Sequence, residues 1–373
     1  MHTPLRDKPK LTTLPPELLG ADDYERLAAA FIEPPTLAYI AGGSGDEWTL
    51  QENRAAFARV RLQPRLLSDC RQGNTACRLL GKSFAHPFLL APLAAQKLVH
   101  PRGELETARG AAAMDAACVV STLSSFALEE IRRDVPVTAW FQLYFQPRRD
   151  TTLALVRRAE AAGYSALVVT LDTPLQPASR RAQRAGFALP ADVRAENLAA
   201  YAPPSPVSLA SGSSRVFQGL MSAAPTEDDL RWLLASTALP VLVKGVLHPA
   251  DAERCIALGA AGLVVSNHGG RALDGAPASL DALPAVRRAV GKDVTLLLDG
   301  GIRSGGDAFK AIALGADAVL VGRPCLYALA VAGALGVAHL LKLLREELET
   351  TMALAGCPTL AQAGEDALFR QRG

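Results

Sequence analysis

Residues 262–275 read GLVVSNHGGRALDG, an apolar run followed by a histidine and an arginine three residues apart. His268 is a candidate general base, because an imidazole gains and loses a proton near neutral pH. Arg271 is a candidate carboxylate binder, because its planar guanidinium matches two carboxylate oxygens. Together they favour removal of a proton from a substrate that carries a carboxylate, although His268 alone could equally be a buried packing residue.

Polar residues also end other apolar runs, at the positions where enzymes built on parallel barrels carry their chemistry. A single residue of this kind could simply cap the helix that follows. Recurrence at six run ends favours one shared site over six separate caps. The residues are Gln142, Tyr144, Thr170, Asp172, Lys244, Ser266, His268, Asp299, Gly300, Gly301, Gly322 and Arg323.

Lys244 ends the apolar run 240–245, PVLVKG. A buried ammonium group is costly unless it meets an anion or a polar ligand. Two roles fit this position: a Schiff-base lysine, or a positive charge that stabilises a reduced cofactor. The residue pattern leaves both roles open.

The segments 299–307, DGGIRSGGD, and 315–324, GADAVLVGRP, have the form of a phosphate site. Their glycines let backbone N–H groups approach a phosphate closely, and Arg303 and Arg323 can add charge-assisted hydrogen bonds. The loops after the last two strands of a barrel commonly hold phosphate. We therefore expect a phosphorylated cofactor at these two segments.

Eight short β-rich runs alternate with segments whose apolar residues recur at helical spacing. Runs that are apolar throughout suit a parallel sheet covered by helices. The pattern predicts an α/β fold, a (β/α)8 TIM barrel. A doubly wound open sheet is the alternative, weakened because no G-x-G-x-x-G opens the first unit. The runs are residues 87–92, 118–122, 137–144, 166–174, 240–245, 262–270, 295–301 and 318–324.

We expect one domain with two parts. Residues 1–80 are predicted to form an N-terminal helical cap and extension, and residues 81–373 the barrel itself. The interval between the fourth and fifth runs is long and includes the segment 201–215, rich in Pro, Ser and Ala. It predicts a long loop after strand 4, over the catalytic face.

Composition argues against several classes of protein. The 39 basic and 37 acidic side chains give a net charge of +2, so no nucleic-acid partner is expected. Six cysteines without a C-x-x-C pair, and no histidine cluster with ligand spacing, predict reduced thiols, no metal and a cytoplasmic location. Segment 324–341 lacks charged residues but is rich in Ala and Gly, which favours a buried helix. We expect no signal peptide and no membrane association.

Nine segments together resemble the FMN-dependent L-2-hydroxy-acid oxidases and dehydrogenases, the family of glycolate oxidase, lactate oxidase and the mandelate-oxidising enzymes. The resemblance runs from about residue 22 to residue 360, and SNHGGRALDG with LVKG is its most specific part. It implies an FMN cofactor and oxidation of a 2-hydroxy acid to a 2-oxo acid. The segments are AYIAGGSGDEWTLQENRAAF, APLAAQKLVHPRGE, STLSS, FQLY, TLDTP, LVKGV, VVSNHGGRALDG, DGGIRSGGD and VGRP.

The resemblance also implies a role for each matching residue. His268 would take the C2 proton or the hydroxyl proton of the substrate, and Asp172 would stabilise the imidazolium. Arg271 would bind the substrate carboxylate, with Tyr39 and Tyr144 bonded to the substrate. The residues implied to hold FMN are Pro92, Leu93, Ala94, Ser124, Gln142, Thr170, Lys244, Ser266, Asp299, Gly300, Gly301, Arg303, Gly322 and Arg323.

The chain departs from the family pattern at the second substrate-binding arginine. That arginine stands eight residues before a phenylalanine, and counting back from Phe187 gives Ser179. Either Arg180 or Arg181 takes its place through a small shift, with Arg181 the candidate, or the site lacks it. Leu93, where many relatives have Thr, favours an apolar pocket.

Phe126, where glycolate oxidases have Trp, favours an apolar pocket as well. Ala94, where several quinone-reducing mandelate enzymes carry Gly, favours O2 as the electron acceptor and H2O2 as the product. The alternatives are a dehydrogenase with a quinone or protein acceptor, a decarboxylating monooxygenase, or a degenerate flavoprotein with a binding role. The family's habit suggests a homotetramer.

Overall fold

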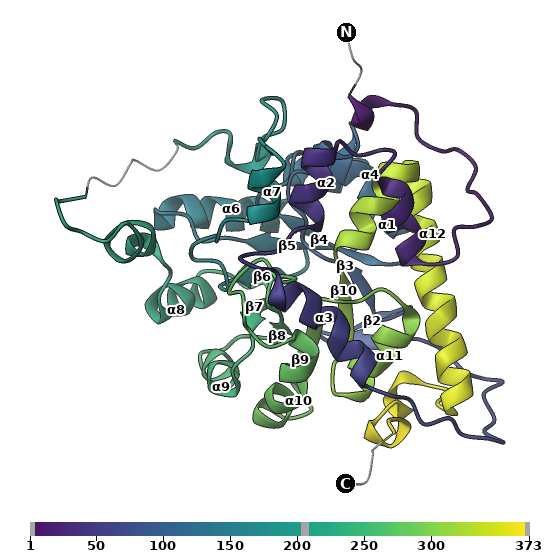
Figure 1. Ribbon diagram of the computed structural model, residues 1–373. Helices are drawn as coiled ribbons and strands as arrows, with labels where there is room; N and C mark the ends of the chain where they lie inside the picture. Colours follow the sequence, from purple (N-terminus) through teal and green to yellow (C-terminus); the bar gives the residue numbers. More distant parts are fainter. Residues whose placement is uncertain (1–3, 203–208, 370–373) are drawn as a thin grey trace.

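The computed structural model describes residues 4–202 and 209–369, and its centre is a closed barrel of eight parallel strands (Figure 1). Neighbouring strands follow the chain order, and the last strand pairs with the first: Val319 lies opposite Phe88. The predicted TIM barrel is therefore confirmed. The strands are β3 (Phe88–Leu90), β4 (Ala117–Ser121), β5 (Ala139–Leu143), β6 (Leu167–Thr170), β7 (Val241–Val246), β8 (Gly262–Val265), β9 (Thr295–Asp299) and β10 (Ala318–Val321).

The strands are apolar throughout because both of their faces are covered. Side chains alternate between the barrel interior and the outer helices, and both sets are buried. Each strand is followed along the chain by an outer helix, and after β6 a long loop that contains α7 (Arg180–Arg184) precedes that helix. These helices are α4 (Gly103–Ala113), α5 (Leu128–Asp134), α6 (Arg149–Ala161), α8 (Glu227–Ala235), α9 (Pro249–Ala257), α10 (Ser279–Val290), α11 (Gly305–Ala313) and α12 (Arg323–Ala355).

Three further α-helices lie within the described residues 4–80. They are α1 (Ala21–Ala28), which packs on α12; α2 (Pro34–Ala41); and α3 (Trp48–Arg59), which packs on α10. The short helix α7 (Arg180–Arg184), in the loop after β6, lies beside α2 (Figure 1). The turn that follows α2 lies at the carboxyl ends of the barrel strands, where the Gly42 carbonyl accepts hydrogen bonds from Arg271 and Arg323.

The amino ends of the barrel strands are closed by a β-hairpin that the sequence analysis did not predict. Strands β1 (Cys77–Leu79) and β2 (Lys82–Phe84) pair antiparallel. Leu79 and Phe84 are buried within the barrel-interior cluster, and the Phe84 ring lies edge-on to Trp140, 6.4 Å away. Because Trp140 stands near the start of β5, the hairpin plugs the amino ends of the strands.

The long loop predicted after the fourth strand is present between β6 and β7 and includes α7 and α8. Part of the segment 201–215 lies outside the described residues. The charge-free segment 324–341 falls in α12, as expected for a buried helix. Within the described chain, α12 is the one helix long and apolar enough to cross a membrane, and 78% of its apolar window is buried inside the protein.

Candidate active site

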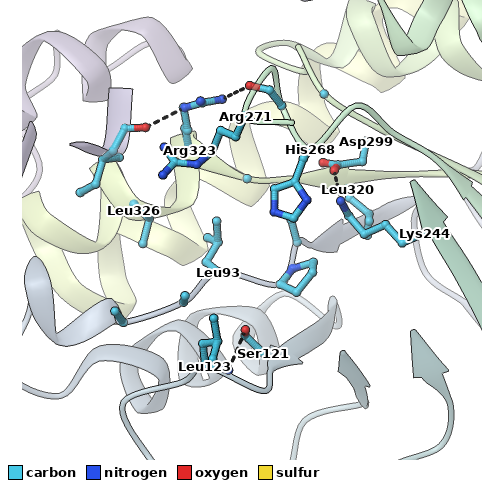
Figure 2. A pocket seen from close by; sticks show the side chains of 18 of the residues that line it. Leu93, Ser121, Leu123, Lys244, His268, Arg271, Asp299, Leu320, Arg323 and Leu326 are labelled. Carbon is cyan, nitrogen blue, oxygen red and sulfur yellow. Dashed lines mark hydrogen bonds and ion pairs between the residues drawn. The ribbon is translucent and has the colours of Figure 1, made fainter. Parts of the chain in front are cut away.

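A cavity opens at the carboxyl ends of the strands, and Figure 2 shows His268 and Lys244 on one side of it and Arg323 and Leu326 on another. Most of the residues predicted from the sequence line it. They come from β3, β5, β7, β8, β9 and β10, the loops after these strands, and α2. They are Tyr39, Pro92, Leu93, Ala94, Tyr144, Lys244, His268, Arg271, Asp299, Gly300, Gly301, Arg303, Gly322 and Arg323.

His268 is held by a carboxylate directly behind it. Its Nδ1 lies 2.8 Å from Oδ1 of Asp172, whose side chain is only 7% exposed. Because a carboxylate accepts and does not donate, Nδ1–H donates to Asp172 and leaves the Nε2 lone pair free to take a proton. The backbone at His268 has φ of +59°, an uncommon conformation that Ser266 supports by accepting the His268 N–H at 3.0 Å. The pair has the arrangement of a general base.

Lys244 is buried and paired. Its Nζ lies 2.9 Å from Oδ2 of Asp299 and 2.9 Å from Oγ of Ser266, and 4.0 Å from Oδ2 of Asp172. Burial alone would lower the pKa of Lys244, but the Asp299 and Asp172 carboxylates outweigh it and raise that pKa. Burial opposes ionisation of Asp299, and Lys244 nevertheless lowers the pKa of that carboxyl. Lys244 therefore brings a permanent positive charge to the cavity wall.

Arg323, at the start of α12, has no carboxylate within bonding distance among the described residues. Its guanidinium donates to the carbonyls of Ile40 (2.8 Å), Gly42 (2.8 Å) and Gly269 (2.9 Å). Desolvation and the nearby charges of Arg271 and Arg303 lower the pKa of Arg323 to about 10. This concentration of positive charge at a helix N-terminus favours an anionic ligand.

The glycines beside this arginine leave space for such a ligand. Gly300 and Gly301 have φ of +111° and +85°, and Gly301 packs so closely on α3 that a Cβ there would meet the Asn53 carbonyl oxygen at 2.3 Å, so this turn requires glycine for its own fold. A Cβ at Gly322 would have only Ala91 nearby, at 3.9 Å, so the cavity is open in front of Gly322. Backbone N–H groups there can be approached closely, as a phosphate requires.

Arg271 is oriented by α2 and the turn that follows it. Nη1 of Arg271 donates to the Tyr39 carbonyl at 2.7 Å and to the Gly42 carbonyl at 3.1 Å. Its guanidinium lies 4.7 Å from the centre of the Tyr39 ring, which stacks on Phe187. Arg271 faces the cavity with its remaining donors, as carboxylate binding requires.

The family model for FMN-dependent dehydrogenases matches residues 28–370. This chain belongs to that family. An L-lactate oxidase from Alicycliphilus denitrificans is 59% identical over 95% of this chain and 97% of its own length. Glycolate oxidase 3 from Oryza sativa subsp. indica is 40% identical over 92% of this chain and 94% of its own length. A crystal structure of a mandelate oxidase with (S)-2-phenylpropionate has a TM-score of 0.85 and 42% identity, covering 95% of this chain and 99% of that one.

The predicted family, the FMN cofactor and FMN-dependent oxidation of a 2-hydroxy acid are confirmed by these matches. The cavity of this FMN-dependent enzyme also fits the cofactor. Arg323, Arg303 and the glycines suit the phosphate, and the apolar Pro92–Ala94 segment suits a flat ring. The ammonium group of Lys244, paired with Asp299, would suit the ring edge on which negative charge develops; the role of Lys244 toward FMN stays a prediction.

Four residues predicted to contact FMN lie outside the cavity lining. Gln142 donates to Thr170 Oγ1 at 3.1 Å and accepts from Ser121 at 3.1 Å. Ser124 accepts from Asn197 at 2.9 Å, and Ser266 donates to Asp299 at 2.7 Å. Direct contact of Ser124, Gln142, Thr170 and Ser266 with FMN stays a prediction. In the structure Gln142 bonds to the lining residue Ser121, and Ser266 bonds to the lining residues Lys244 and Asp299.

Arg181 is not brought to the cavity either. Its guanidinium pairs with Glu47, and the adjacent Arg180 pairs with Asp46. Both arginines border a surface depression on α7 instead. The structure therefore leaves Arg271 as the arginine placed for a substrate carboxylate, next to the FMN-side arginines.

Sequence reasoning missed several lining residues. Ser121 ends β4, so the run-end pattern could have found it. Leu123, Leu98 and Leu326 are apolar and carry no signal of function. Gln176, in the loop after β6, lines this cavity and also an adjoining one that shares Tyr39 and Arg271. Only the folded loop brings Gln176 there.

Proposed function

We propose that this FMN enzyme oxidises a small L-2-hydroxy acid to the 2-oxo acid and passes the electrons to O2, producing H2O2. The observation that carries the proposal is the His268–Asp172 pair in one cavity with Arg271. A base and a carboxylate-binding cation on the same wall can hold both reacting ends of a 2-hydroxy acid.

The residues divide the reaction as follows. When bound beside Lys244 and the Pro92–Ala94 segment, FMN would supply the acceptor for the two electrons of the oxidation. Arg271 binds the carboxylate and so fixes the substrate in front of the base. His268 would take one proton at Nε2, from C2 or from the hydroxyl group, and Asp172 would stabilise the resulting imidazolium through Nδ1. The other hydrogen of the CH–OH group would leave with the two electrons or as a second proton, and O2 would take up two electrons and two protons to give H2O2. Burial raises the pKa of Tyr144, so its hydroxyl stays protonated and donates to the substrate.

L-Lactate is the favoured substrate. Three relatives that are 59%, 50% and 46% identical are each named L-lactate oxidase. Leu93 and Leu123 line the cavity and provide apolar surface for a short aliphatic side chain. Ala94, also in the lining, supports O2 as the acceptor, and those relatives carry the name oxidase too. The homotetramer and the cytoplasmic location stay predictions.

Anaerobic mixing of the FMN-loaded enzyme with hydroxy acids tests the proposal. The panel is L-lactate, glycolate and L-mandelate, with D-lactate as the stereochemical control. We expect L-lactate to bleach the flavin absorbance fastest, D-lactate to leave it unchanged, and admission of air to restore the colour rapidly. Absence of bleaching by every L-acid would refute the substrate class, and slow recolouring would refute O2 as acceptor.

A further inference from the structure

We infer that Arg181 is a positioning residue that acts on Arg271 through Glu47, an inference that rests on the proposed role of Arg271 in substrate binding. Arg181 lies on α7 outside the cavity, with its side chain 48% exposed. Its partner Glu47 is only 13% exposed. The pair connects the loop after β6 to the turn between α2 and α3.

Glu47 holds that turn by its other carboxylate oxygen. Oε2 pairs with Arg181, while Oε1 accepts the backbone N–H of Gly43 at 3.0 Å. The backbone at Glu47 has φ of +67°, a conformation that a residue with a side chain adopts only when its surroundings support it. Arg181 and the Gly43 N–H provide that support from two sides.

The turn that Glu47 holds supplies the carbonyl that orients the cavity arginines. Gly42 accepts from Arg271 Nη1 at 3.1 Å and from Arg323 Nη2 at 2.8 Å. A carbonyl shared by two guanidiniums transmits any displacement of the turn to both of them.

The turn also packs closely against the segments on both sides of it. A Cβ at Gly42 would come within 2.7 Å of Ser179 Oγ, and one at Gly43 within 2.8 Å of the Gly270 carbonyl. Ser44 donates its N–H to that same Gly270 carbonyl at 2.9 Å. The turn is therefore wedged between α7 and the loop that carries Arg271, and the Arg181–Glu47 pair fixes it from outside.

The chain offers a matched control on the same helix. Arg180 pairs with Asp46, and both of those side chains are more than half exposed. Arg180 borders the same depression as Arg181, but Asp46 accepts no hydrogen bond from Gly43. Replacing Arg180 removes a comparable charge and ion pair without releasing the turn.

Steady-state kinetics of four variants test the inference, with L-lactate as substrate. We expect Arg181→Ala to raise KM about fivefold with kcat within about twofold of wild type, because binding geometry is loosened while the base is untouched. Arg181→Lys restores most of the KM, since the ion pair is retained. Arg180→Ala leaves KM unchanged. Equal KM values for Arg181→Ala and Arg180→Ala overturn the inference.

Glu47→Gln separates positioning from direct substrate binding by Arg181. The glutamine keeps an oxygen for the Gly43 N–H but loses the charge that holds Arg181. A positioning role predicts a raised KM, and no further rise in Arg181→Ala/Glu47→Gln. If Arg181 bound substrate itself, Glu47→Gln would free it and leave KM unchanged or lower.

FMN affinity gives a readout that does not depend on the substrate. Because Arg323 uses the same Gly42 carbonyl, Arg181→Ala should weaken FMN binding about twofold to threefold, whereas Arg180→Ala should not. If no hydroxy acid reduces the wild-type enzyme, the proposed function fails, and this titration still decides the positioning role. Unchanged FMN affinity in Arg181→Ala together with unchanged KM refutes it.

Discussion

Two cations of the cavity, Lys244 and Arg323, stand in opposite electrostatic situations. Lys244 has the carboxylate of Asp299 at 2.9 Å, and neighbouring carboxylates raise its pKa despite burial. Arg323 has three backbone carbonyls instead, and desolvation with two neighbouring guanidiniums lowers its pKa. The protein pairs Lys244 with its own carboxylates, whereas it leaves the charge of Arg323 to be paired by a ligand.

The difference shows which part of the site is complete before the cofactor binds. In the Lys244 region, Lys244 pairs with Asp299 and His268 pairs with Asp172, while Oδ2 of Asp172 has no hydrogen-bond partner among the described residues and lies 4.0 Å from Lys244 Nζ. The Arg323 region presents unneutralised charge at a helix N-terminus, which an anion stabilises. Glu104 is the converse case, a buried carboxylate without a cation partner in the described part of the chain.

The largest effect is expected at His268, the proposed general base in the Lys244 region. His268→Asn keeps a residue that tolerates the left-handed backbone but removes the proton acceptor. We expect FMN to remain bound and anaerobic flavin reduction by L-lactate to slow about 100-fold to 10,000-fold. His248→Asn is the control, because His248 caps α9 through its side chain and asparagine can do the same. Near wild-type reduction in His268→Asn would exclude His268 as the base.

Lys244→Met tests whether the stability of the apoprotein depends on the ion pair between Lys244 and Asp299. Removing the lysine leaves the Asp299 carboxylate buried without its cation, which should lower the free energy of unfolding of the apoprotein by about 3–5 kcal/mol. Lys244→Met/Asp299→Asn should recover most of that loss. Denaturant unfolding of the apoproteins measures both. A loss under about 1 kcal/mol in the single variant would contradict the pairing.

Arg323→Met tests whether the unpaired charge of Arg323 contributes to FMN binding. We expect FMN affinity to fall about tenfold to a hundredfold, as for the loss of a hydrogen bond to a charged group. Fluorescence titration of the apoprotein with FMN gives the dissociation constant. Arg345→Met is the control, because Arg345 pairs with Glu349 beyond the kink that Ala332 and Gly333 make in α12. Equal FMN affinity in the two variants would rule out a phosphate role for Arg323.

The smallest effect is expected at Glu104. Its Oε1 accepts the N–H groups of Ser125 (2.8 Å) and Gln96 (3.1 Å), while Oε2 has no hydrogen-bond partner among the described residues. Burial raises the pKa of Glu104 above its ordinary value of 4.5.

The sign of the pH dependence follows from that raised pKa. The Glu104 contribution to stability is fully present below pH 4.5 and is lost as the pH rises through the raised value. Glu104→Gln cannot ionise, so its stability relative to wild type should improve from about pH 5 to about pH 8, on the order of 1 kcal/mol. Thermal unfolding at several pH values measures this difference. A stability difference independent of pH would show that Glu104 keeps its ordinary pKa.

Most of the barrel could be predicted because its signal is local. Eight apolar runs separated by helical segments specify a covered parallel sheet, and every predicted run overlaps a strand of the barrel. Residues at the run ends, such as His268, Asp299 and Arg323, then share one site, because the carboxyl ends of the strands in a parallel barrel all lie at one end. The hairpin of β1 and β2 escaped prediction, since its three-residue strands are too short for a periodic pattern.

The amino-acid sequence by itself determined the barrel, the residues at its mouth and, through their chemistry, the need for a phosphorylated cofactor. The tertiary structure alone decided which of those residues face the cavity. Gln142 and Thr170 bond to each other behind the lining, and Arg181 pairs with Glu47 outside it. The physical reason is that a residue's type sets what it can bind. Contacts between segments distant in the chain set where its side chain points.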